Sequence, residues 1–206
     1  MKNRFFDLQQ PPKEEATDKM SSVFKSKYIN KHFEKIAHLD KDLKRLPTVE
    51  EFFFLQTDNS FNEFTFIPFI AQNHNIQHLY ICTYSISRRV IDALIELYDK
   101  GYCDQITLMI SDSLIKRNPT TMELLAAQVS SRANFIVNYS WSHAKVTLIK
   151  TQDAYFGIEG SGNHSENAHY EQYLFYNSKE TYEFRRKIFT DVKIRAKAIG
   201  GAIQRN

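Results

Sequence analysis

Two short polar clusters in the second half of the chain carry side chains that could act together on a phosphate group. They are Ser-His-Ala-Lys at 142–145 and Gly-Ser-Gly-Asn at 160–163. The Lys145 ammonium can neutralise phosphate charge, while the Ser161 hydroxyl and the Asn163 amide can donate hydrogen bonds to phosphate oxygens. His143 is the member of the group that can act as nucleophile or proton carrier near neutral pH. These residue types predict a phosphate-reactive site that needs no metal ion or other cofactor.

Neighbouring strands are needed to bring the two clusters together. The residue types predict adjacent strands at 144–151 and 154–159. Side chains alternate between the two faces of a strand, so His143 and Lys145 face the same way, as do Ser161 and Asn163 after the next strand. Glycines beside the serine allow the backbone to approach a ligand closely.

The surrounding sequence predicts an α/β fold, a mixed sheet flanked by helices. Strands are predicted at 79–84, 105–110, 133–139, 144–151, 154–159 and 171–176, and a short apolar run at 52–55 precedes them. Helices are predicted from Asn59 or Ser60 to Asn73, from Ser87 to Gly101, at 121–130, and from Lys179 onward as a basic C-terminal helix.

Residues 1–48 differ in texture from the rest of the chain. One or two amphipathic helices are predicted between Met20 and Leu39, and Pro47 marks a break after them. We therefore expect a mostly helical, polar appendage at 1–48 and a main domain at 49–206.

Several classes of protein are excluded by composition and by missing motifs. Hydrophobic residues at 42% and charged residues at 25% are ordinary globular values, against collagen-like or wholly disordered chains. The sequence contains no phosphate-binding GxxxxGK[ST], no complete GxGxxG, no GxSxG and no HExxH. Cys82 and Cys103 are too few for a disulfide framework or a four-thiolate zinc site. Since we find neither a bilayer-spanning apolar run nor a signal peptide, we expect a cytoplasmic protein without a membrane partner.

The net charge of +3 conceals an uneven distribution along the chain. Residues 1–48 carry 11 Lys/Arg against 7 Asp/Glu, residues 49–178 carry 8 against 14, and residues 179–206 carry 8 against 3. Basic ends around an acidic middle are either solvated helix faces or nucleic-acid-binding segments.

The spacing of the two clusters resembles a known signature. His143-x-Lys145 followed by Gly160-Ser161-x-Asn163 is similar to the HxK…GSxN motif of the phospholipase D superfamily. Glu171 matches a carboxylate that orients the histidine in small single-motif bacterial endonucleases of that superfamily. The resemblance covers residues 50–190 and implies a phospholipase D-like fold. It also implies that a histidine attacks phosphorus to form a phosphohistidine, that a second histidine protonates the leaving oxygen, and that water completes hydrolysis.

The resemblance has one departure and several competing interpretations. The full signature of the family is HxKxxxxD, and this chain has Lys150 where the signature has the aspartate. In the family that aspartate mainly supports the structure. Taken singly, HxK can arise by chance, GSGN can be a turn, and Glu171 can be an exposed strand residue. We interpret His164 and His169 as loop residues, and Trp141 either packs or provides a platform for base stacking.

One motif supplies half of the two-histidine site that the resemblance implies. His32 and His78 both lack a lysine two residues later, so no second HxK exists. A two-fold homodimer would place two copies of His143 together, one as nucleophile and one as general acid. Lys145 and Asn163 of both chains would stabilise the five-coordinate phosphorus, and Glu171 would hold the ring tautomer.

These observations lead to a metal-independent phosphodiesterase, a nuclease acting on DNA, as the first hypothesis. Its predicted catalytic residues are His143, Lys145, Ser161, Asn163 and Glu171, of which Lys145, Ser161 and Asn163 also bind substrate. An inactive phospholipase D-like DNA-binding or interaction module is the alternative. A toxin, defence or mobile-element component with a partner on residues 1–48 is a third.

Overall fold

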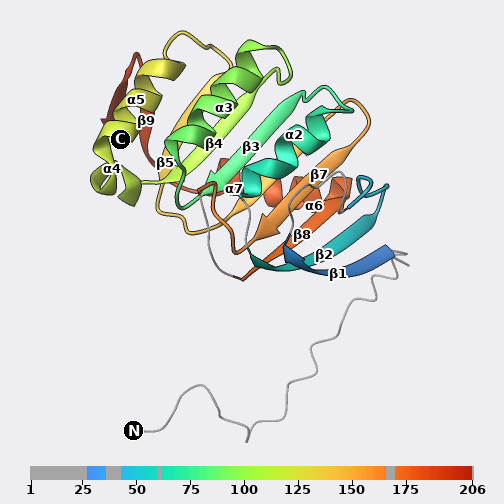
Figure 1. The fold of residues 1–206 in the computed structure, drawn as a ribbon. Coiled ribbons are helices and arrows are strands. Elements are labelled where there is room, and N and C mark those ends of the chain that lie inside the picture. The colour runs from blue at the N-terminus through green and yellow to red at the C-terminus, as the bar shows by residue number, and fades with distance from the viewer. Residues whose placement is uncertain (1–26, 36–42, 60–61, 166–169, 206) are drawn as a thin grey trace, which may run out of the picture.

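The computed structural model describes residues 27–35, 43–59, 62–165 and 170–205. The strands in these ranges are β1 (Lys27–Lys35), β2 (Glu51–Asn59), β3 (His78–Thr83), β4 (Ile106–Ser111), β5 (Phe135–Ser140), β6 (Val146–Lys150), β7 (Tyr155–Gly160), β8 (Glu171–Asn177), β9 (Ile194–Ile199) and β10 (Ala202–Arg205). They form one sheet in the spatial order β1-β2-β8-β7-β6-β3-β4-β5-β9-β10 (Figure 1). The pairs β1–β2, β3–β4 and β4–β5 are parallel and the other neighbours antiparallel. The predicted mixed sheet is confirmed.

Helices flank this sheet on both faces. The described helices are η1 (Glu63–Thr65), α2 (Phe66–Ala71), α3 (Arg88–Asp99), α4 (Ser113–Arg117), α5 (Pro119–Val129), α6 (Lys179–Arg186) and α7 (Ile188–Asp191). Figure 1 shows α2, α3 and α5 over one face, with α6 and α7 behind the sheet. Strand β6 connects the two cores, since Ile149 packs in the larger one while Leu148 packs with Tyr182 of α6 in the smaller one. No described helix is long and apolar enough to cross a membrane.

Helix α3 illustrates how local sequence sets the boundaries of an element. The Ser87 hydroxyl accepts a hydrogen bond from the Val90 amide at 3.3 Å, so it caps the helix as predicted. Leu94 and Ile95 are buried on the face toward the sheet. Gly101, with φ of 72°, adopts the left-handed conformation that ends a helix at low cost.

Before β3, the structure corrects one predicted helix and one predicted boundary. The helix predicted from Asn59 or Ser60 to Asn73 is shorter. Asn62 caps η1 by accepting from the Phe64 amide, and α2 ends at Ala71. The apolar run at 52–55 lies inside β2.

Strand β1 contradicts the helices predicted between Met20 and Leu39, as far as that segment is described. Residues 27–35 pair in parallel with β2, from Lys27 opposite Glu51 to Lys35 opposite Asn59. An open strand edge offers a row of unpaired backbone groups, and pairing with them overrides a weak helical spacing. The remainder of the predicted helical segment lies outside the described residues, and the domain division at residue 48 stays a prediction.

The C-terminal segment is helical only at its beginning. Helix α6 starts at Lys179 as predicted but ends at Arg186, and β9 and β10 follow α7 as a hairpin on the free edge of β5. Gly200 and Gly201 have φ of 59° and 84°, which is the geometry of a tight hairpin turn. The prediction of a helix continuing beyond Arg186 was therefore wrong, and the Gly-Gly step is the local signal for the turn.

Candidate active site

The histidine and lysine of the first cluster meet at the start of β6. Lys145 Nζ is 3.1 Å from His143 Nδ1 and donates a hydrogen bond to the His143 carbonyl oxygen at 3.0 Å. Both residues come just before the first residue of β6, outside the regular strand, and the side chain of His143 is exposed. The predicted convergence of His143 and Lys145 is thus present at the N-terminal end of the interior strand β6, with the imidazole open to solvent.

Tyr84, which sequence reasoning did not single out, forms the wall behind the histidine. Its ring centroid lies 4.5 Å from that of His143, with 46° between the planes. The guanidinium carbon of Arg117 lies 4.5 Å from the centroid of the Tyr84 ring. Arg117 also donates a hydrogen bond to the Tyr84 carbonyl oxygen at 3.3 Å. Tyr84 directly follows β3, the neighbour of β6, so the sheet order rather than any motif places it here.

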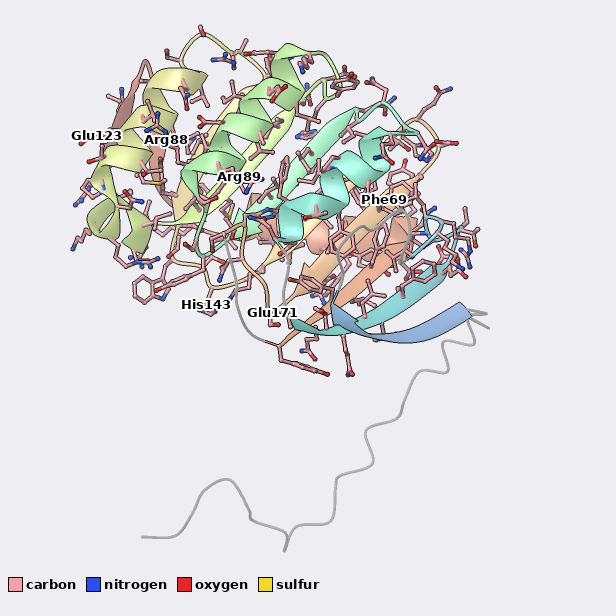
Figure 2. All side chains as sticks on the ribbon, in the orientation of Figure 1. Phe69, Arg88, Arg89, Glu123, His143 and Glu171 are labelled. Carbon is pink, nitrogen blue, oxygen red and sulfur yellow. The ribbon has the colours of Figure 1, made fainter. Side chains whose placement is uncertain are left out.

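The second cluster meets Glu171 across the pair β7–β8. Ser161 follows β7 and donates a hydrogen bond to Glu171 Oε2, while the Gln172 amide donates to Ser161 Oγ at 3.2 Å. Figure 2 shows His143 and Glu171 along the same edge of the molecule. Among the described contacts Glu171 bonds Ser161 rather than His143. Its predicted role in orienting the histidine therefore stays a prediction.

Two glycines allow the second cluster to pack directly on the aromatic ring of Tyr173. A Cβ atom at Gly162 would lie 2.3 Å from the Tyr173 hydroxyl oxygen, and one at Gly160 would lie 2.3 Å from the Gln172 carbonyl oxygen. Any larger residue would push the loop away from β8. Asn163, which follows Gly162, is half-buried.

Electrostatics connect the two clusters. Partial burial lowers the pKa of the Lys145 ammonium, and the carboxylates of Glu171 and Glu63 oppose that shift. Lys145 therefore stands within the field of the carboxylate that holds Ser161. Lys145 thus links the imidazole that it contacts to the hydroxyl–carboxylate pair of Ser161 and Glu171.

A second polar group is buried beneath the exposed one. Thr147 of β6 donates its hydroxyl proton to Glu63 Oε1 at 2.8 Å, and its oxygen lies 2.9 Å from His164 Nε2. When Thr147 donates to Glu63, its oxygen accepts a hydrogen bond from His164 Nε2. All three side chains are fully buried. Glu63 Oε2 and His164 Nδ1 have no hydrogen-bond partner among the described residues.

Burial shifts the pKa values of Glu63 and His164 in opposite directions. Desolvation raises the pKa of Glu63 to about 8, against the hydrogen bond from Thr147 and the charge of Lys145. Desolvation also lowers the pKa of His164 to about 3. At neutral pH the buried carboxyl is mostly protonated and the buried imidazole is neutral. His164 belongs to no regular helix or strand, as expected, but it bridges to Ile86 and is core rather than surface. His169 lies outside the described residues.

Two cavities adjoin the exposed pair. One, of about 260 Å³, is lined by Tyr84, Ser111, Ser113, Trp141, Ser142 and His143. The other, of about 520 Å³, includes Lys145, Glu159, Gly160 and Arg185 in its lining. His143 therefore lines the first cavity and Lys145 the second. The described residues contain no cluster of three His, Cys, Asp or Glu side chains arranged as metal ligands.

Lys150, at the motif's aspartate position, lies at the opposite end of β6. It is half-buried there, opposite His78 of β3 and Tyr155 of β7 in the sheet register. Nearby Asp153 faces His74 at 3.6 Å. The exchanged residue is thus separated from His143 by the length of the strand.

No protein-family model and no curated protein matches this chain. Its fold does match solved structures. Phosphatidylserine synthase of Haemophilus influenzae Rd KW20 is 13% identical, with a TM-score of 0.51, over 69% of this chain and 39% of its own. Polyphosphate kinase from Porphyromonas gingivalis is 15% identical, with a TM-score of 0.56, over 74% of this chain and 29% of its own. Both neighbours belong to the phospholipase D superfamily, so the fold described here is phospholipase D-like. The chain spans less than half the length of either neighbour.

Proposed function

We propose that this protein is a metal-independent phosphodiesterase that hydrolyses DNA through a phosphohistidine intermediate. The observation that carries the proposal is the contact between Lys145 and His143 at the N-terminal end of β6 in a phospholipase D-like sheet, beside the Ser161–Glu171 pair. The likeness in fold to phosphatidylserine synthase and polyphosphate kinase supports phosphoryl transfer in general. The nuclease activity and the DNA substrate go beyond that likeness and are part of the proposal.

In this proposal Lys145 binds the phosphate and His143 is the nucleophile. Lys145 donates to Nδ1 of His143 before substrate binds, which places the proton of a neutral ring on Nε2. A bound phosphate oxygen competes with Nδ1 for the hydrogen bond from the Lys145 ammonium. When Lys145 donates to the phosphate instead, the imidazole can carry its proton on Nδ1, which leaves the Nε2 lone pair free. The Nε2 lone pair then forms the N–P bond as the P–O bond to the leaving group breaks. Ser161 and Asn163 donate to the remaining phosphate oxygens.

A second imidazole completes the cycle. The leaving oxygen must receive a proton, and in our proposal His143 of a second copy donates it. The same residue then accepts a proton from the water that attacks phosphorus and restores the first histidine. The exposure of His143 at the end of β6 is compatible with a two-fold arrangement of this kind.

The DNA preference rests on charge. The segment from residue 179 to 206 carries 8 Lys/Arg against 3 Asp/Glu, and such segments contact backbone phosphates with a strong dependence on salt.

A non-catalytic DNA-binding module is the second candidate, and two observations favour it. Lys150 stands where the signature has an aspartate, and Glu171 bonds Ser161 instead of His143. In that case the pocket would bind phosphate without turnover.

Hydrolysis of bis(p-nitrophenyl) phosphate, with and without EDTA, separates the two candidates. We expect turnover that EDTA does not reduce and that His143→Ala abolishes. His74→Ala is the matched control, because this histidine is remote from the cluster and contacts Asp153 and Phe156 instead. Loss of activity in EDTA, or activity that survives His143→Ala, would sink the mechanism. The mass in solution is measured in parallel, and a strictly monomeric active protein would contradict the shared site.

A further inference from the structure

Trp141 is a large aromatic side chain in an unusual position. It directly follows β5, two residues before His143, and 72% of it is exposed. The Arg195 guanidinium lies 5.3 Å from its ring centroid, and Arg195 is itself held by Asp112 Oδ2 at 3.3 Å. The indole is therefore held by a cation from β9 without being covered by the core.

Trp141 lines one cavity and contacts an arginine that lines another. It lines the hollow of about 260 Å³ that contains His143. The arginine beside it lines a groove of about 510 Å³ formed by Asp112, Ile115, Lys116, Lys193, Ile194, Arg195, Ala196 and Arg205. Four cations and one carboxylate give this groove a positive potential. Figure 1 shows β9 and α4, which carry several of these residues, at one end of the molecule.

We propose that this surface binds single-stranded DNA, with an unpaired base stacked on Trp141 and the adjoining backbone phosphates in the cationic groove. The proposal rests on the phosphodiesterase function and names the form of its substrate. The strand would run from the groove over the indole, so that the next phosphate lies at His143.

An exposed ring between a cationic groove and a phosphate-reactive histidine matches the way that proteins bind single strands. Such sites combine basic tracks for the backbone with aromatic side chains for the bases. In a duplex the bases are stacked on one another, so a ring at this position could not reach a base face without unpairing it. The geometry therefore favours an unpaired segment over a double helix.

The chain contains one tryptophan, so its fluorescence reports on this position alone. The experiment uses the full chain carrying His143→Ala, which prevents cleavage, titrated with a 12-nucleotide single strand. We expect quenching of Trp141 fluorescence, and weaker quenching by a duplex of equal length, by inorganic polyphosphate and by anionic phosphatidylglycerol vesicles.

Two pairs of variants test the two parts of the surface, with anisotropy of a labelled strand as readout. Adding Trp141→Ala should weaken binding by about tenfold or more, since a base stack is lost. Phe184→Ala is the control, because Phe184 is 60% exposed and lies 5.3 Å from Arg185, outside the groove. Arg205→Ala should reduce the salt dependence of binding, whereas Arg88→Ala on α3 should not.

The outcomes separate this inference from the function on which it rests. Equal affinity for duplex, polyphosphate or vesicles, or unchanged binding by Trp141→Ala, overturns the single-strand surface. Bis(p-nitrophenyl) phosphate has no base to stack, so its hydrolysis by the chain with native His143 tests the chemistry independently. Strand binding without such hydrolysis refutes the enzyme and keeps the binding surface.

Discussion

His143 and His164 lie at the same end of the antiparallel pair β6–β7, yet their surroundings have little in common. His143 precedes β6, is exposed and contacts Lys145, whereas His164 follows β7, is fully buried and contacts Thr147. Desolvation lowers the pKa of His164 to about 3, so its ring stays neutral near pH 7. Solvent access, more than residue type or motif position, decides which of the two imidazoles can exchange protons with a substrate.

The sharpest way to break this comparison is to remove each ring in turn. We expect His143→Ala to lower the rate of phosphodiester hydrolysis by roughly 10³-fold or more, with little change in the free energy of unfolding. His164→Ala should do the reverse, because it opens a cavity and removes a partner of Thr147. Rates per folded molecule and urea unfolding curves are measured together. A stable, fully active His164→Ala protein would contradict the structural role.

Glu63 should make stability depend on pH. Its pKa rises from 4.5 in the unfolded chain to about 8 in the fold, so the folded state holds the extra proton between these values. The free energy of unfolding should therefore fall as pH rises from 4.5 to 8, by on the order of 3 kcal/mol. Glu63→Gln, which mimics the protonated carboxyl, should lose that decline. Urea unfolding at pH 5 and pH 8 measures both proteins.

The lowered pKa of His164 changes the free energy of unfolding in the opposite direction and over a different pH range. The folded state holds fewer protons than the unfolded chain between pH 3 and 6.5, so stability from this residue falls as pH drops below 6.5. Above pH 6.5 only Glu63 of these two residues should change the free energy of unfolding. If that free energy has the same pH dependence in the wild type and in Glu63→Gln above pH 6.5, Glu63 is not buried as described.

Thr147 connects the two buried groups through one hydroxyl. Thr147→Val keeps the shape and removes the partner of both Glu63 and His164, so we expect a loss of about 2 kcal/mol in the free energy of unfolding. Thr147→Ser retains the hydroxyl and should lose less. Equal losses in the two variants would mean that the methyl group, rather than the hydrogen bonds, matters.

Ser161 should show the smallest effect. Its hydroxyl is exposed and bonded to Glu171, so Ser161→Ala should reduce the hydrolysis rate by about tenfold or less and leave the unfolding transition in place. Steady-state rates against bis(p-nitrophenyl) phosphate measure the change. A loss as large as that of His143→Ala would give Ser161 a more direct part in the chemistry.

Local sequence patterns predicted most of the strands, helix α3 and the contact between His143 and Lys145. Ser87 and Gly101 set α3 correctly, and the two-residue spacing predicted that His143 and Lys145 would meet. Such features depend on neighbours along the chain, which a sequence displays directly.

The parts that could not be predicted depend on contacts between distant residues. Glu63 lies in the phenylalanine-rich stretch 52–69, and only the fold brings it to Thr147. A carboxylate within such a stretch is nevertheless a usable signal, because a buried charge requires a partner or a shifted pKa. Strand β1 was missed for the same reason, since its pairing with β2 is tertiary.

The pairing of β2 with β8 also determines when the molecule can fold. Glu51 lies opposite Asn177 and Thr57 opposite Glu171, so the first of these strands leaves the ribosome long before its partner exists. Phe53 and Leu55 of β2, both buried in the finished sheet, lack the β8 side of their packing during that interval, although β1 precedes β2 in the chain. Long-range pairing of this kind slows folding and exposes apolar surface to aggregation. The yield of folded protein should therefore depend on how β2 is shielded until β8 is synthesised.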